Sequence, residues 1–381
     1  MPESESARNS GLASNRIIIH CDLDAFFASV ETLHLDLDEN IPLIIGSDPL
    51  SGKGRGIVST CNYTAREFGI RSAMPISEAW RRCPGPPQGV AMYCRGRFNL
   101  YRRASRMVMQ ILKEHCDVFE KAGIDEAYLD VTDRCDADWD VASSLARNLQ
   151  QKLNSELSLS TSFGIAPTRI TAKMASEENK PQGIFRVLPS EVSNFFIDRS
   201  VHEVPGIGPA TATRLAEWGI RTMDEAHAQG ALALSSMLGE RLGSWLVAVV
   251  EGETSNAVSP LRTRRSIGKE HTFARDVSDA QVVLRRLHEL VRTVCERLHE
   301  LGAAGRLLEV KLRYRGFETL NHGKSISVAM DDLEVFEHIS TRLLLEMYDQ
   351  LRPVRLIGFR VAQLESHLDR QSTLASVVEE E

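Results

Sequence analysis

"RIIIHCDLDAFF", residues 16–27, combines three features in twelve positions. An apolar run typical of a buried strand comes first. Asp22 and Asp24 follow two residues apart, a spacing that places both side chains on one face of a strand. Phe26 and Phe27 come directly after them. Burying an unpaired carboxylate is unfavourable, so acids beside aromatic rings indicate a site more readily than a solvated strand end.

A second acidic segment, "GIDEAYLD", occurs about a hundred residues later and contains Asp125 and Glu126. Neighbouring residues of a regular strand face opposite ways, so these two serve one site only at a bend, which Gly123 makes accessible. Alone, the pair also fits a polar hairpin tip. Two acidic strand ends in one domain favour a shared site, and three carboxylates suit Mg²⁺. Two such ions would support an in-line phosphoryl transfer.

Polar and basic side chains that suit a triphosphate occur in two further segments. "STCNYTAREFG" (59–69) places Thr60, Tyr63 and Arg66 in a predicted strand-to-helix turn, and "ENKPQGIF" (178–185) contains Lys180. An Arg side chain in such a site would give bidentate contacts to phosphate. Each fragment alone is equally typical of an ordinary surface.

The composition is that of a globular protein of several domains. The 381 residues are 43% hydrophobic with a net charge of −7, and no apolar run reaches the length of a membrane span. The N-terminal segment is polar, without the pattern of a signal peptide, so we expect a disordered tail on a cytoplasmic protein. Seven cysteines without a C-x-x-C pair argue against a disulfide framework and a zinc site.

The order of predicted elements indicates an α+β multidomain chain. Strands and helices alternate up to about Pro181, and the chain from there to about Glu253 reads as helical throughout. A basic linker, "VSPLRTRRS", follows. A helix over about 278–301, strands at 306–315 and 325–329, a helix over 332–350 and a final strand then predict a small sheet covered by two helices.

Several features of the C-terminal half fit DNA binding. Gly206 and Gly208 in "VPGIGPATATRLAEWGI" fit a helix-hairpin-helix turn that approaches phosphate, or an ordinary glycine-rich connection. In "RLLEVKLRYR", apolar residues alternate with a mainly basic set, which suits a DNA backbone or simply solvent. The apolar residues are Leu308, Val310, Leu312 and Tyr314; the others are Glu309, Lys311, Arg313 and Arg315. The linker adds Arg262, Arg264 and Arg265, and residues 260–324 hold fourteen Lys or Arg against eight Asp or Glu.

Five ordered motifs resemble those of the Y-family DNA polymerases, in particular the polymerase IV (DinB-type) branch. They are "CDLDAFFASVE", "STCNYTAREFGIRSAMP", "GIDEAYLDVT", "TAKMASEENKPQGI" and "VPGIGPATATRL", and the resemblance covers about residues 16–364. It implies a right-hand fold. The expected parts are a tail (1–15), palm (16–25 and 94–180), fingers (26–93), helical thumb with helix-hairpin-helix (181–257), basic linker (258–265), α/β little finger (266–364) and flexible tail (365–381).

The resemblance also implies roles for individual residues. Asp22, Asp125 and Glu126 would be the catalytic metal ligands, with the Leu23 carbonyl as a further ligand for two Mg²⁺ ions, or Mn²⁺ in their place. Phe27 would be the steric gate against a 2′-hydroxyl, with Phe26 beside the sugar, and Thr60, Tyr63, Arg66 and Lys180 would hold the triphosphate. The family commonly has Ser where this chain has Gly123, and a hydroxyl near the primer end is thereby lost.

The implied function is template-directed, low-fidelity translesion DNA synthesis by a monomer without a proofreading exonuclease. Its partners would be primer–template DNA and deoxynucleoside triphosphates. "QSTLASVV" offers Gln371, Leu374, Val377 and Val378 as a sliding-clamp motif without its usual aromatics, or as an ordinary acidic tail. Two other classes remain as alternatives: a non-catalytic damaged-DNA-binding scaffold, and a palm-type nucleotide cyclase. The complete acidic motifs oppose the first, and the basic C-terminal region opposes the second.

Overall fold

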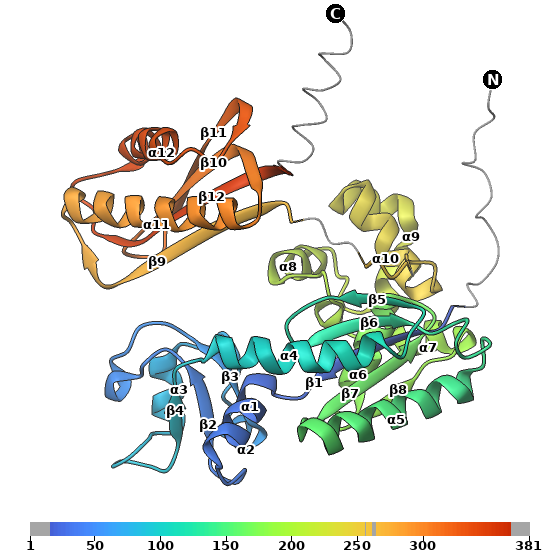
Figure 1. The fold of residues 1–381 in the computed structure, drawn as a ribbon. Helices are drawn as coiled ribbons and strands as arrows, with labels where there is room; N and C mark the ends of the chain where they lie inside the picture. Colours follow the sequence, from blue (N-terminus) through green and yellow to red (C-terminus); the bar gives the residue numbers. More distant parts are fainter. Residues whose placement is uncertain (1–15, 256, 261–263, 367–381) are drawn as a thin grey trace, which may run out of the picture. The chain divides into compact units, whose positions relative to one another are not determined.

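A computed structural model describes residues 16–255, 257–260 and 264–366 of the chain (Figure 1). The chain divides into two compact units, the first ending at residue 261 and the second beginning at residue 262. Each unit is described by itself. Among the described residues, no helix is long and apolar enough to cross a membrane.

A five-stranded sheet forms the centre of the first unit, in the order β5-β6-β1-β7-β8. β1 (Ile18–Leu23) is its middle strand and runs antiparallel to both neighbours. Five of its six residues are buried, as expected for a central strand that is covered on both faces. The other strands are β5 (Val118–Lys121), β6 (Glu126–Asp130), β7 (Thr161–Ala166) and β8 (Ile184–Arg186). β5 and β6 form the predicted hairpin.

Helices cover both faces of this sheet (Figure 1). Ile19 belongs to the core that contains the buried faces of α4 (Phe98–Lys113) and α5 (Trp139–Leu157). Ile18, one residue earlier, belongs to the core on the side of α6 (Arg169–Glu178), as the period of two along a strand requires.

A smaller sheet with the strand order β3-β2-β4 carries its own core. Ile44, Val58 and Ile76 are fully buried there. The elements are α1 (Phe26–Leu35), β2 (Leu43–Gly46), η1 (Leu50–Gly52), β3 (Val58–Cys61), α2 (Tyr63–Glu67), α3 (Ile76–Arg82) and β4 (Met92–Cys94).

The prediction of a helical segment from Pro181 to Glu253 is wrong at its start. β8 pairs parallel with β7, and three residues are too few to show a strand alternation. The remainder is helical: η2 (Pro189–Glu191), α7 (Val192–Phe196), η3 (Val201–Glu203), α8 (Pro209–Glu217), α9 (Met223–Leu238) and α10 (Glu240–Glu251).

The second unit is an antiparallel sheet in the order β11-β10-β12-β9, with two helices on one face. Its elements are β9 (Ser266–Val277), α11 (Ala280–Glu300), β10 (Ala303–Tyr314), β11 (Thr319–Met330), α12 (Leu333–Met347) and β12 (Val354–Ser366). The predicted inward residues of β10, Leu308, Val310, Leu312 and Tyr314, are buried as expected. β9 was not among the predicted elements.

Candidate active site

The ends of β1 and β6 bring the predicted carboxylates to one place. Asp22 on β1 pairs in register with Glu126, the first residue of β6. The Leu23 N–H donates to the Asp125 carbonyl at 3.0 Å, and Asp125 lies in the bend before β6. The bend expected from Gly123 is therefore present. Among the described residues, these carboxylates do not converge tightly enough to form a ready three-ligand cluster.

Lys180 neutralises the first of these carboxylates. Its Nζ lies 2.7 Å from Asp22 Oδ1 and 2.6 Å from Glu177 Oε1. Burial raises the pKa of Asp22 to about 6, against the opposing effect of Lys180. Burial also raises the pKa of Asp125, with a further contribution from the Glu126 charge. Burial thus disfavours the anionic form of two of the three carboxylates, and at Asp22 the Lys180 ammonium only partly offsets this effect.

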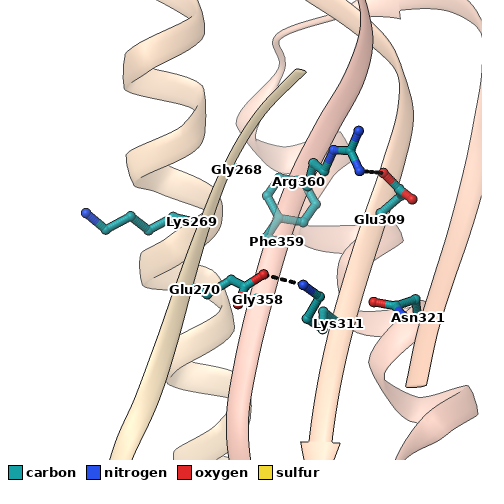
Figure 2. A pocket seen from close by; sticks show the side chains of 9 residues that line it. All are labelled: Gly268, Lys269, Glu270, Glu309, Lys311, Asn321, Gly358, Phe359 and Arg360. Carbon is teal, nitrogen blue, oxygen red and sulfur yellow. Dashed lines mark hydrogen bonds and ion pairs between the residues drawn. The ribbon is translucent and has the colours of Figure 1, made fainter. Parts of the chain in front are cut away.

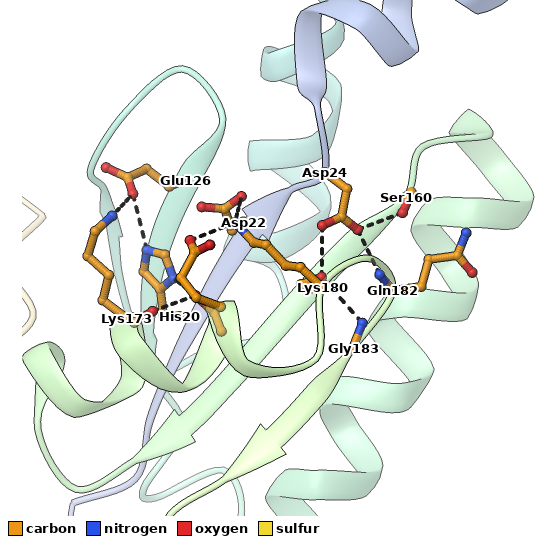
Figure 3. Close-up of polar contacts among 12 residues, drawn as sticks. His20, Asp22, Asp24, Glu126, Ser160, Lys173, Lys180, Gln182 and Gly183 are labelled. Carbon is orange, nitrogen blue, oxygen red and sulfur yellow. Dashed lines mark hydrogen bonds and ion pairs between the residues drawn. The ribbon is translucent and has the colours of Figure 1, made fainter. Parts of the chain in front are cut away.

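Glu126 differs because two groups stabilise its charge (Figure 3). The Lys173 ammonium contacts Glu126 Oε2, and His20 Nε2 lies 3.3 Å from the same oxygen. His20 and Lys173 outweigh burial and lower the pKa of Glu126 to about 2. His20 is fully buried, which lowers its pKa, and its Nδ1 lies 2.8 Å from the Ser176 hydroxyl.

Sequence reasoning did not identify His20, Lys173 or Ser176. A helix-face spacing links Lys173, Ser176 and Lys180, which lie on or just after α6. Ser176 follows Lys173 by three residues, and Lys180 follows Ser176 by four. That spacing was the available signal.

Asp24 joins three segments through hydrogen bonds from hydroxyl and backbone N–H groups. It is 2% exposed and accepts hydrogen bonds from the Ser160 hydroxyl (2.6 Å), the Ser162 hydroxyl (2.8 Å) and the Gln182 N–H (2.9 Å). These contacts attach the end of β1 to β7 and to the turn after Lys180 (Figure 3). Asp24 therefore positions the loop that carries Lys180.

The two phenylalanines occupy different environments. Phe26 is 3% exposed within the core, whereas Phe27 is only partly buried and stacks on Tyr101, with ring centroids 4.3 Å apart and planes 11° apart. Tyr101 donates to the buried Glu31 at 2.5 Å, and Arg97 pairs with Glu31 at 2.7 Å. The Phe27 ring is thus held in position by the Tyr101 ring, which is itself fixed by its hydrogen bond to Glu31.

The predicted triphosphate residues lie at the turn between β3 and α2. Thr60 is on β3, and Arg66 lies over the Tyr63 ring at 4.4 Å. Asn62 caps α2 by accepting from the Ala65 N–H at 3.0 Å. The Tyr63 hydroxyl is buried without a hydrogen-bond partner in the described structure, and burial raises its pKa, with the Asp24 charge contributing. An orphaned hydroxyl beside an arginine suits a bound anionic ligand.

Gly123 makes room beside the carboxylates. A Cβ at this position would lie 2.9 Å from Glu126 Cγ and 3.2 Å from Asp125 Oδ1. The difference from the family's usual Ser thus bears on the space available to both acids.

The predicted DNA-contact residues are spread over both units. Gly206 has a φ of 106°, Gly208 immediately precedes α8, and a Cβ at Gly208 would meet open space. Arg264, Arg265 and Arg315 are exposed. Lys311 pairs with Glu270 at 2.5 Å, and Arg313 donates to Thr319 at 2.7 Å. Arg262 and the clamp-motif residues Gln371, Leu374, Val377 and Val378 lie outside the described residues.

Comparisons with known proteins agree with the sequence motifs. A model of the impB/mucB/samB family matches residues 21–177, and that of its C-terminal domain matches residues 264–374. The chain is 36% identical to DNA polymerase IV of Methanoculleus marisnigri, over 94% of this chain and 98% of the relative. It is also 36% identical to DNA polymerase IV of Streptococcus pneumoniae, over 90% and 96%.

Solved structures show the same likeness. A Y-family DNA polymerase chimera of Dbh and Dpo4 aligns with a TM-score of 0.82 at 29% identity, covering 92% of this chain and 99% of the other. An insertion ternary complex of Dbh DNA polymerase aligns with a TM-score of 0.65 at 28% identity and the same coverage.

Proposed function

The chain belongs to the impB/mucB/samB family of Y-family DNA polymerases, and we propose that it is a template-directed translesion DNA polymerase that works through the carboxylates of β1 and β6. The observation that carries this proposal is the pairing of Asp22 on β1 with Glu126 at the start of β6, with the Asp125 carbonyl accepting from the Leu23 N–H beside them. Polymerase activity follows from the family; the assignment of roles to residues rests on this geometry.

The acidic residues fit divalent cations. Their oxygens are hard donors, and ammonium groups already contact Asp22 and Glu126 where a cation would bind. Asp22, Asp125, Glu126 and the Leu23 carbonyl would hold two Mg²⁺ ions, or Mn²⁺. Bound ions would supply electrostatic stabilisation of the attacking and leaving oxygens during phosphoryl transfer. The reaction would need no nucleophile from the protein, because the primer 3′-hydroxyl attacks the nucleotide.

The nucleotide would bind between the acidic residues and the β3–α2 turn. Thr60, Tyr63 and Arg66 would contact the triphosphate, with the orphaned Tyr63 hydroxyl finding its partner there. Lys180, which pairs with Asp22 in this structure, would place its positive charge beside the phosphates. Phe27 would lie under the sugar as the steric gate, and the buried Phe26 would support it.

The remaining parts would hold DNA and connect to partners. We assign residues 16–25 and 94–180 to the palm, 26–93 to the fingers, 181–257 to the thumb and 266–364 to the little finger, with β8 added to the palm sheet. Gly206, Gly208 and the basic residues of the second unit would contact the DNA backbone. We further propose that the protein is a cytoplasmic monomer, that it copies DNA with low fidelity, and that its C-terminal tail binds a sliding clamp.

Primer extension on defined templates tests this function. With an annealed primer, each of the four deoxynucleotides offered singly should extend most efficiently opposite its template partner, with measurable misinsertion of the others, and a panel of template lesions should show which are bypassed. Nucleotide consumption without primer or template would favour a cyclase. DNA binding with no extension would favour a scaffold.

A further inference from the structure

The outer face of the second unit's sheet, on the side away from α11 and α12, contains a hollow of about 350 Å³ (Figure 2). The residues of this face stand in rows across the strands. One row runs from Glu270 on β9 over Gly358 on β12 to Lys311 on β10. The next row runs from Gly268 over Arg360 to Glu309. Each row thus combines two charged side chains with one glycine, which lies between the charges in the first row and beside Arg360 in the second.

Lys311 and Glu270 pair across an intervening strand. Lys311 Nζ lies 2.5 Å from Glu270 Oε1, although β12 separates β10 from β9. The pair can form because Gly358 lies between them: a Cβ there would stand 2.8 Å from Glu270 Cγ and 3.5 Å from Lys311 Cβ. In the neighbouring row, Arg360 pairs with Glu309 at 3.3 Å.

These pairs change the charge that the face presents. β10 alone looks mainly basic, but Glu270 and Glu309 neutralise Lys311 and Arg360. Both pairs are substantially exposed, with Lys311 at 35% and Glu270 at 48%, so each is weak and can exchange its partner. A DNA phosphate is, like a carboxylate, an anionic acceptor for Lys and Arg, so it can take the place of the carboxylate beside each cation.

We propose that Glu270 and Glu309 act as internal counter-ions that compete with DNA phosphates for Lys311 and Arg360, and so limit the affinity of this face for duplex primer–template DNA. This inference rests on the proposed function. Binding requires both ion pairs to open, after which two carboxylates remain close to the phosphate backbone. The face therefore holds DNA less tightly than its count of basic residues predicts, which favours release.

Fluorescence anisotropy of labelled primer–template duplex with the full chain tests the proposal. Glu270→Gln and Glu309→Gln should each tighten binding by about 1.5- to 5-fold, the range expected for freeing one exposed ion pair. Glu296→Gln is the matched control, because it removes the same charge from α11, on the helix-covered side. Equal effects of all three substitutions would overturn the proposal.

A double-mutant cycle separates the pair from general charge. Lys311→Gln should weaken binding more in the Glu270→Gln background than in the native chain, because only there is Lys311 free for phosphate. Strict additivity would contradict the competition. Primer extension by the native chain is measured alongside: its absence would refute the proposed function, whereas extension with additive substitutions would refute only this inference.

Discussion

The acid site and the outer face of the second unit use the same kind of ion pair at different depths. Lys180 and Asp22 are 16% and 17% exposed, whereas Lys311 and Glu270 are 35% and 48% exposed. In the acid site, burial moves the pKa of Asp22 up while its neighbours move that of Glu126 down. On the outer face, solvent screens each pair. Burial thus shifts the pKa of the carboxylate in the first pair, whereas the exposed second pair is screened and can exchange its partner.

The largest effect is expected from removing two carboxylates of the buried acid site. Asp125→Ala combined with Glu126→Ala should reduce primer extension by about a thousandfold or more, because the electrostatic stabilisation of phosphoryl transfer is lost. DNA affinity, measured by anisotropy, should stay within about threefold, because exposed residues are proposed to carry it. Extension at the native rate would contradict the assignment of catalysis to the buried acid site.

Phe27 tests whether packing beside the acid site acts as a filter. Phe27→Ala removes the ring that stacks on Tyr101, so discrimination between deoxyribo- and ribonucleotides should fall by about 10- to 200-fold. Ratios of kcat/KM for the two sugars measure this effect. Phe27→Tyr keeps the ring and should retain most of the discrimination. Unaltered sugar selection by the alanine variant would remove the gate role.

The opposite pKa shifts predict opposite effects on stability in EDTA. The pKa of Glu126 is about 2, below its ordinary value, so its charge stabilises the folded protein above about pH 4.5, and this contribution is lost as the pH falls toward 2. Glu126→Gln should lower the free energy of unfolding by about 1–3 kcal/mol at pH 7 and by less at pH 3.

For Asp22, with a pKa of about 6, the sign reverses: stability is lost as the pH rises from about 4 to 6 and stays lost above. Asp22→Asn should therefore raise the free energy of unfolding by about 1 kcal/mol at pH 7 and change it little at pH 4. Urea denaturation of both variants measures these differences. Shifts of the same sign in both variants would contradict the proposed balance of burial and pairing.

The smallest effect is expected from a substitution at Gly358, the glycine between Lys311 and Glu270 on the exposed face. Gly358→Ala places a methyl group against Glu270 and should move that flexible side chain away from Lys311. DNA affinity should rise by at most about twofold, in line with a weak exposed pair. The same substitution in the Glu270→Gln background should have no further effect on anisotropy; an equal rise there would point to another cause.

The strands that carry the acids could be predicted because they are buried. β1 and β6 show apolar runs with carboxylates at their ends, and the bend at Asp125 followed from Gly123. β9 could not be predicted in this way. Within the described part of the chain it is an edge strand paired with β12 alone, and its only buried residues are Ile267 and Phe273, so no apolar alternation marks it.

The supporting residues of the acid site were equally hard to predict. His20 and Lys173 meet at Glu126 only after β1, β6 and α6 have come together. Charge balance on the outer face was missed for the same reason, since the pairing of Lys311 with Glu270 depends on Gly358 in a third strand. Spacing along one segment reports a helix face or a strand face, but it carries no information on partners from other segments.

Asp24 has a consequence for how the polypeptide matures on the ribosome. Its three hydrogen-bond partners lie 136, 138 and 158 residues further along the chain. A nascent chain that ends before Ser160 holds Asp22 and Asp24 but lacks β7 and the turn after Lys180, so it cannot complete the acid site. Asp22 and Asp24 are thus synthesised well before the residues that hold them in place, and their site is complete only after the whole central sheet has emerged.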